Sequence, residues 1–214
     1  MTPEKLVRWT VIVALLNFAA TSTLLFGRPD LATRESSEKI FTVAMDLEKQ
    51  KKFAEAAELY ESIFYGMSAT LIAPRAGERL ANIYRSRMLD VDKARTVLRE
   101  VAAFKESAYA EKAQADLAFM ETHWGEDGSI LKIWYEADAS YRAKDYSKTL
   151  EILNRIAKEF PNSTLRPPSM MHIAKINKKL QKNEEAARVL REFLTAYPKD
   201  SAANEARTLL RSVQ

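Results

Sequence analysis

One apolar spacing occurs four times along the chain. Each copy has an opening residue, a small residue three positions later, a large apolar or aromatic residue four positions further, and another after three more. The copies lie within "KKFAEAAELYESIF" (51–64), "LDVDKARTVLREVA" (89–102), "KDYSKTLEILNRIA" (144–157) and "KNEEAARVLREFL" (182–194). Side chains at spacings of three and four share one face of an α-helix. The sequence therefore predicts four amphipathic helices that each bury the same face.

A second apolar segment precedes each of these helices, and a short polar turn joins the two. The apolar and small positions of the preceding segments are Ile40, Val43, Ala44 and Leu47, then Leu80, Ala81 and Tyr84, then Ile133 and Ala137, then Ile173 and Ala174. The unit is thus a helix–turn–helix pair. Pairs that recur at about 34–38 residues predict an α-solenoid, in which each repeat covers the apolar face of the next.

These units resemble tetratricopeptide (TPR) repeats. That family has a small residue in the first helix, an aromatic residue that opens the second helix, a central Ala followed by a large residue, and a Pro that ends the unit. The matching residues are Ala44, Phe53, Ala56 and Tyr60, then Ala81, Ala94 and Leu98, then Ala137, Tyr146, Leu153 and Pro161, then Ala174, Ala186, Leu190 and Pro198. The Gly usual at the turn is absent throughout, and Thr149 stands where an Ala is usual. The resemblance covers residues 37–212 and implies an all-α fold.

One helical segment does not fit the pairing. "SAYAEKAQADLAFMETHW" (107–124) predicts a helix, but the loop "GEDGS" follows where a second repeat helix would start. We interpret this segment as the closing helix of a first pair of repeats, residues 37–124. The second pair is expected at residues 129–212, with "SAANEARTLLRSV" as its capping helix. Gly125 and Gly128 then mark a break or hinge between the halves.

The N-terminal region carries an uncharged run, "WTVIVALLNFAATSTLLFG" (9–27). As a helix it would be about 28 Å long, close to the thickness of about 30 Å of a bilayer's hydrocarbon core. We expect a retained transmembrane helix, with residues 1–8 as a short tail and residues 28–36 as a tether. A cleaved signal peptide is the alternative, because Ala20-Thr21-Ser22 resembles a small-x-small cleavage site.

One stripe of this span is small and polar. Thr10, Ala14, Asn17 and Thr21 follow the i, i+4, i+7, i+11 spacing of one helix face. Such residues allow close approach of another transmembrane helix and can hydrogen-bond to it. We expect the stripe to pack on a partner helix; the alternative is a single span that tolerates these residues alone.

Membrane orientation is only weakly indicated. Basic residues flank the span almost equally, and the basic stretch before the apolar run favours an inside N-terminus. "EFPNS" and "AYPKDSAANEA" are similar to stretches of bacterial envelope TPR proteins, and the layout resembles single-span, membrane-anchored members. This resemblance implies a bacterial inner membrane with the repeats in the periplasm.

The composition argues against catalysis. The chain has no Cys, which excludes disulfides, thiolate metal sites and Cys nucleophiles. It also lacks a Gly-rich phosphate loop and a Ser/His/Asp motif. A His123–Glu126–Asp127 metal site is conceivable, but acidic residues between two Gly are more often a solvated turn. His172 lies beside an apolar run and is interpreted as structural. We expect no enzyme activity, no cofactor and no metal.

Charge is unevenly distributed. Residues 142–214 hold 15 Lys/Arg and 8 Asp/Glu, or +7, whereas residues 1–141 hold 18 and 21, or −3. The basic part has no interleaved aromatic pattern for stacking on bases, and a membrane anchor argues against nucleic acid as a ligand. We expect a protein partner with an acidic segment.

In TPR proteins the first helix of each pair lines a groove, so the resemblance implies groove residues here. The candidates are Phe41, Met45, Glu48, Glu78, Asn82, Arg85, Trp134, Asp138, Tyr141, Met171, Lys175, Lys178 and Lys179. Lys175, Lys178, Lys179 and Lys182 share one helix face at i, i+3, i+4 and i+7. This face is predicted to bind an acidic partner segment; a solvated lysine face is the alternative.

Together these features predict a non-catalytic, membrane-anchored scaffold for protein–protein interaction. Its expected role is an accessory or assembly subunit of a membrane or envelope protein complex. One alternative is a periplasmic chaperone-like factor that binds translocating or unfolded clients. Another is an exported, soluble TPR protein with a cleaved signal peptide.

We expect the mature protein to begin before residue 9 and to keep its apolar run, because that run is long enough to anchor it. N-terminal sequencing of the protein from its native membrane tests this, and a start near Thr23 would identify a cleaved signal instead. A reporter that is active only in the cytoplasm, fused after Gln214, should be silent. Reporter activity would reverse the predicted orientation.

Overall fold

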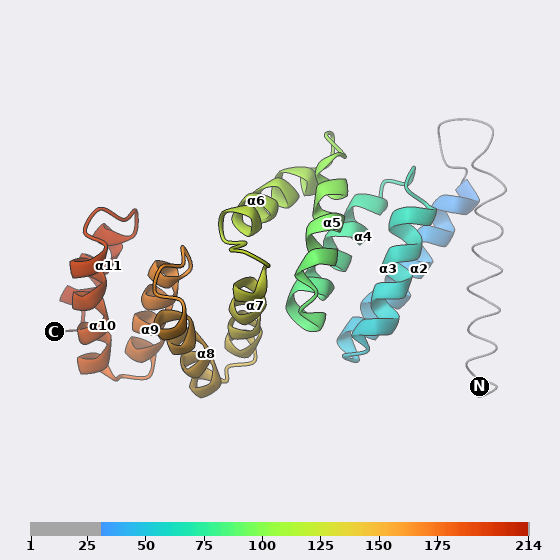
Figure 1. The fold of residues 1–214 in the computed structure, drawn as a ribbon. Helices are drawn as coiled ribbons and strands as arrows, with labels where there is room; N and C mark the ends of the chain where they lie inside the picture. Colours follow the sequence, from blue (N-terminus) through green and yellow to red (C-terminus); the bar gives the residue numbers. More distant parts are fainter. Residues whose placement is uncertain (1–30, 214) are drawn as a thin grey trace. The chain divides into compact units, whose positions relative to one another are not determined.

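The structure, a computed structural model, describes residues 31–213. Within this range the chain is all-α, as predicted, and short turns join the helices (Figure 1). The helices are α2 (Leu31–Lys49), α3 (Phe53–Gly66), α4 (Ala73–Ile83), η1 (Tyr84–Met88), α5 (Val91–Ala102), α6 (Ala108–Thr122), α7 (Ser129–Arg142), α8 (Tyr146–Glu159), α9 (Arg166–Lys179), α10 (Asn183–Ala196) and α11 (Ala203–Arg211).

Membrane insertion was predicted only for the N-terminal run. The transmembrane helix at residues 9–27 and its stripe of Thr10, Ala14, Asn17 and Thr21 lie outside the described residues. From residue 31 to residue 213, no helix combines the length and apolar character needed to cross a bilayer.

The chain divides into two compact units, and the division between Ala118 and Phe119 falls inside α6. In the first unit α2 packs closely on α3, α3 on α4, and α4 on α5. In the second unit α7, α8, α9, α10 and α11 do the same. Consecutive packing of this kind confirms the predicted TPR-like solenoid.

The recurring apolar positions form the core of each repeat. The central small residues are almost completely buried, with 0% exposure for Ala56, Ala94 and Ala186 and 1% for Thr149. The residues four positions later are at most 1% exposed; they are Tyr60, Leu98, Leu153 and Leu190. Burying one such Leu side chain stabilises the fold by about 1.5–3 kcal/mol.

All four turns within the helix pairs use the same backbone conformation. Lys51, Leu89, Lys144 and Gln181 have φ between 55° and 62°, in the left-handed region. Each lies two residues before its second helix, where the resemblance leads one to expect Gly. A side chain in this conformation costs about 1–2 kcal/mol, so each pair tolerates strain at its turn. These turns therefore keep the left-handed conformation although none of them has Gly at this position.

The helix pair formed by α4 with η1 and α5 contains one extra residue before its turn. From the buried first-helix Ala to the left-handed residue there are eight positions between Ala81 and Leu89, but seven between Ala44 and Lys51. The π-helix η1 takes up this residue, and the N–H of Asp90 donates to the carbonyl of Tyr84 at 2.9 Å. A π turn holds one more residue than an α turn. The following helix α5 therefore keeps its apolar face on the core.

Replacing Lys144 with Gly is expected to stabilise the second unit by about 0.5–1 kcal/mol. Relief of the left-handed strain exceeds the extra backbone entropy that Gly loses on folding. Urea denaturation of the full chain measures the difference. As a control, Lys132→Gly places Gly at an exposed helical position and should destabilise by about 1 kcal/mol. Equal destabilisation by both substitutions would show that the turn stores no strain.

Candidate functional site

The surface implied by the TPR resemblance is made by the first helices of the pairs. In the second unit these helices are α7 and α9, and α11 continues the series. We call this surface the first-helix face of the second unit. It comprises Trp134, Asp138 and Tyr141 of α7, His172, Lys175, Lys178 and Lys179 of α9, and Glu205 and Ser212 at α11.

His172 lies between two aromatic rings on this face. Its ring centroid is 5.3 Å from that of Trp134 and 6.3 Å from that of Tyr141. Partial desolvation of the imidazole lowers the pKa of His172, and the charge of Lys175 lowers it further. Carboxylates on α7 and α11 oppose this shift with smaller effects. The imidazole is therefore held towards its neutral form.

Two lysines of α9 reach across to α11. The Nζ of Lys175 lies 2.7 Å from a carboxylate oxygen of Glu205. The Nζ of Lys178 donates to the hydroxyl of Ser212 at 2.8 Å. Both Lys175 and Glu205 are about half exposed, so their ion pair contributes little to stability. The charge of Lys178 has no carboxylate partner within the described part of the chain.

Lys179 turns the other way, towards the end of α7 and the start of α8. Its Nζ lies 5.0 Å from the ring centroid of Tyr146 and 5.8 Å from that of Tyr141. A hydrogen bond with Tyr146 raises the pKa of Lys179, which keeps the ammonium charged. Tyr141 is 38% exposed, so one aromatic ring of this cluster remains open to a partner. The face thus combines exposed aromatic surface with positive charge.

Three ion pairs join the first helices of the first unit. Glu48 of α2 lies 3.4 Å from Arg79 of α4 and also accepts from the Tyr60 hydroxyl at 3.0 Å. Glu78 of α4 pairs with Lys112 of α6. Glu48 and Glu78, both predicted to line the groove, are thus each paired with a cation within this unit.

The third pair, between Arg85 and Asp116 at 2.8 Å, is largely covered, because the Arg85 side chain is only 12% exposed. The spacing of 31 residues from Arg85 to Asp116 equals that from Glu48 to Arg79. Helix α6 is therefore related to α4 in the same way as α4 is related to α2. The closing segment occupies the place of a first helix.

The structure buries two of the predicted groove residues. Phe41 is 3% exposed and packs edge-on against Tyr60, and Met171 is 4% exposed in the core of the second unit. Met45 and Asn82 are half-buried. The side chains of Trp134, Asp138, Tyr141, Lys175, Lys178 and Lys179 lie on the first-helix face as described above.

His172 is a face residue that the sequence interpretation placed in a purely structural role. It is exposed, whereas its neighbours Met171 and Ile173 are buried. The signal was present, because His172, Lys175 and Lys179 follow the i, i+3, i+7 spacing of one helix stripe. The apolar run on either side of His172 concealed it.

The other histidine has a local structural role. The Nδ1 of His123 lies 2.7 Å from the hydroxyl oxygen of Thr164, which also donates to the carbonyl of Thr122 at 3.3 Å. These bonds tie the C-terminal end of α6 to the loop before α9. Between residues 31 and 213, no three His, Asp or Glu side chains are grouped so that they could hold a metal ion.

Comparison with known proteins identifies the repeats of the second unit. Residues 133–163 and 169–200 match the tetratricopeptide repeat family, and they coincide with the α7–α8 and α9–α10 pairs. No curated protein matches the chain. A crystal structure of nearly identical TPR-like repeats, from a Podosopora anserina protein named after kinesin light chain, is 17% identical. That likeness covers 82% of this chain and 84% of the other chain, with a TM-score of 0.38.

Stability is expected to fall on acidification partly through His172. Its folded-state pKa is lowered, so the unfolded chain binds the proton more readily and folding loses free energy as pH drops below the ordinary His value. Between pH 7 and pH 5, His172→Gln should lose less stability than its parent. Both proteins should carry His123→Gln, because the pKa of His123 is lowered too. Parallel pH profiles of urea midpoints would contradict this.

Proposed function

We propose that this chain, which carries tetratricopeptide repeats at residues 133–163 and 169–200, is a membrane-anchored scaffold that holds other proteins. TPR repeats imply protein partners in general, and the open first-helix face of the second unit supports a binding role here. The finer proposal is an accessory or assembly subunit of a membrane or envelope complex. It rests on the uncharged run at residues 9–27.

The observation that carries the binding proposal is the unbalanced positive charge at the C-terminal end of α9 and in the turn to α10. Lys178 reaches only a neutral hydroxyl, and Lys179 lies over two aromatic rings. The prediction that Lys182 shares one helix face with these lysines was wrong, because α9 ends at Lys179 and the left-handed turn at Gln181 follows; Lys182 lies just before α10 and is exposed. Over residues 31–213, none of these three ammonium groups has a carboxylate within ion-pair distance. An acidic segment of a partner would supply the missing charge, and it would meet Tyr141 beside the lysines. We therefore assign an acidic protein segment to this face.

The membrane part of the proposal concerns residues 9–27. An anchor there would hold the repeats at the bilayer surface, and the stripe of Thr10, Ala14, Asn17 and Thr21 would pack on a helix of the partner complex. The repeats would then face the periplasm of a bacterial inner membrane. An anchor and a soluble binding face on one chain suit a subunit that keeps a second protein close to a membrane complex.

Charge reversal at Lys178 of α9 and at Lys182, just before α10, tests the binding proposal. The double variant Lys178→Glu, Lys182→Glu should bind a poly-glutamate peptide at least about fivefold more weakly than the parent, because attraction becomes repulsion. Affinity of the parent should also fall as salt screens the charges. Fluorescence anisotropy of labelled peptide with the full chain measures both effects. Lys175 is left unchanged, because its reversal would also repel Glu205.

Lys199→Glu is a control for a single charge reversal away from this face, because Lys199 is exposed in the turn between α10 and α11. It should leave the affinity unchanged. Purification of both variants from native membranes, followed by mass spectrometry, extends the test to the natural partner. A scaffold gives one stoichiometric complex that only the double variant loses. Many substoichiometric proteins would indicate a chaperone-like factor. If the double variant bound the peptide as tightly as the parent, the proposal that this face binds acidic segments would be contradicted.

A further inference from the structure

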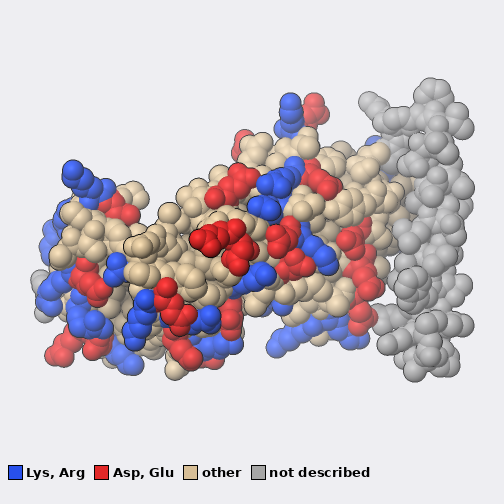
Figure 2. Space-filling model, viewed as in Figure 1, with Lys and Arg blue, Asp and Glu red and all other residues tan. Residues whose placement is uncertain are grey.

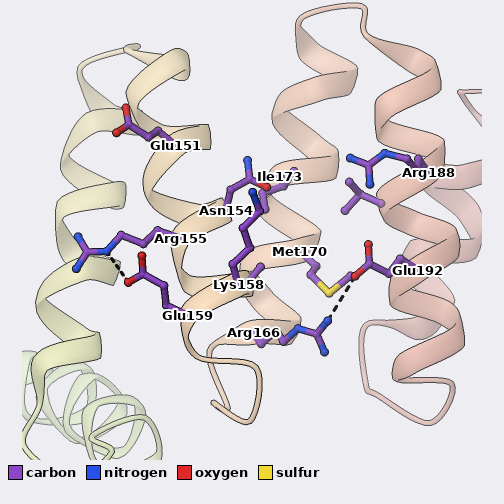
Figure 3. Close-up of a pocket in the computed structure, with 12 residues that line it drawn as sticks. Glu151, Asn154, Arg155, Lys158, Glu159, Arg166, Met170, Ile173, Arg188 and Glu192 are labelled. Atoms are coloured by element: carbon purple, nitrogen blue, oxygen red, sulfur yellow. Dashed lines mark hydrogen bonds and ion pairs between the residues drawn. The ribbon is translucent and has the colours of Figure 1, made fainter.

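A separate groove lies on the second unit, away from the first-helix face. It runs between the second helices α8 and α10, and α9 forms its floor (Figure 3). Its volume is about 900 Å³, and it is open along one side. Helices α8 and α10 each pack on α9, so the space between them is a feature of the fold and not a gap between units.

The floor of the groove is apolar. Met170 and Ile173 of α9 and Val189 of α10 line it, with exposures of 2%, 3% and 6%. Such side chains at the bottom of an open groove offer a site for one apolar side chain of a ligand. Because these side chains are at most 6% exposed, little of their surface is available to the broad flank of a whole helix. The shape therefore fits an extended segment that inserts a single residue.

The charges directed into the groove are mostly positive. Figure 3 shows Lys158 of α8, Arg166 at the start of α9 and Arg188 of α10 around the apolar floor, with Glu192 opposite Arg166. Glu192 and Arg166 are 3.4 Å apart, a long ion pair. In the described residues Lys158 has no carboxylate partner at all. Three cations thus face one carboxylate.

The remaining acidic lining residues do not offset this charge at the floor. Figure 3 shows Glu151, Arg155 and Glu159 directed to the side of α8 that faces away from α10. Glu159 is already paired with Arg155 on the same helix, at 2.9 Å. Arg188 lies 3.0 Å from Glu185 of its own helix, a half-exposed pair that a ligand carboxylate can replace at little cost. The groove therefore presents cations around an apolar floor.

We propose that this groove binds an extended segment of a partner protein in which one apolar residue is flanked by Asp or Glu. The apolar side chain contacts Met170, Ile173 and Val189, and the flanking carboxylates meet Lys158 and Arg188. This second docking surface does not depend on the lysines of α9. One chain could then hold two acidic segments, one on each side of the second unit.

The probe is a labelled peptide, Glu-Glu-Leu-Glu-Glu, titrated against the full chain and followed by fluorescence anisotropy. The chain should bind it at least fivefold more tightly than Glu-Glu-Gly-Glu-Glu, because only the first can fill the floor. The double variant Lys158→Glu, Arg188→Glu should weaken binding at least about tenfold. Asn154→Trp should also weaken it, because this exposed lining residue can carry a bulky ring into the groove without disturbing the core.

Two controls locate the site. Arg191→Glu reverses one charge, against two in the groove variant, on an exposed residue of α10 that does not line the groove, and it should leave the affinity unchanged. Lys178→Glu, Lys182→Glu should leave the preference for Leu over Gly intact. Failure of the first-helix face and failure of the groove are thereby distinguished. Circular dichroism confirms that each variant is folded.

Several results would overturn the proposal. Equal binding of Lys-Lys-Leu-Lys-Lys would show that the groove does not select acidic segments. Unchanged affinity in both Asn154→Trp and the Lys158→Glu, Arg188→Glu variant would place the peptide elsewhere. Tighter binding of phosphatidylglycerol vesicles or of single-stranded DNA, lost in the same groove variants, would assign the surface to a lipid or to nucleic acid.

Discussion

The close approach of helices at buried small residues is the contact on which both units depend. Ala44 and Ala56 in the first pair, and Ala174 and Ala186 in the last, are completely buried. Any longer side chain there would push the helices apart. Inserting even one extra methylene group into a close-packed core lowers the stability of the fold. The large residues four positions later fill the remaining space. Gly77 shows the same demand in α4, because a Cβ there would lie 2.5 Å from a methyl carbon of Val101.

Much of the fold follows from apolar spacing. The four second helices and their first-helix partners lie where the apolar periodicity predicts them. Apolar residues spaced by three and four positions share a face only in an α-helix, so the pattern indicates one type of element. The bends were harder to foresee. Lys51, Lys144 and Gln181 adopt a conformation that their residue types disfavour, since the packed helices on either side leave the turn no alternative. Residue propensities do not predict this backbone conformation, because the packing of the two helices determines it.

The candidate site was only partly visible in the sequence. The lysines of α9 stood out through charge, but their partners on α11 and α8 depend on packing between repeats. Met171 and His172 are adjacent, and a shift of one residue on a helix turns a side chain by about 100°. Family resemblance alone could not fix that angle. The groove between α8 and α10 had no sequence signal, because its walls come from two repeats. On the second unit, Figure 2 shows basic and acidic side chains interspersed, which conceals local imbalance.

The π turn at Tyr84–Met88 has a consequence for how such a protein can change its length. An inserted residue in an α-helix would rotate every later side chain of that helix away from its neighbours. Here the π turn confines this rotation to a single turn of helix. The apolar side chains of α5 therefore face the core as they do in the second helices of the other pairs. Repeats built this way can gain a residue without re-evolving the sequence that follows. The π turn thus places the additional residue at the end of a helix, where the backbone absorbs it without displacing the helix that follows.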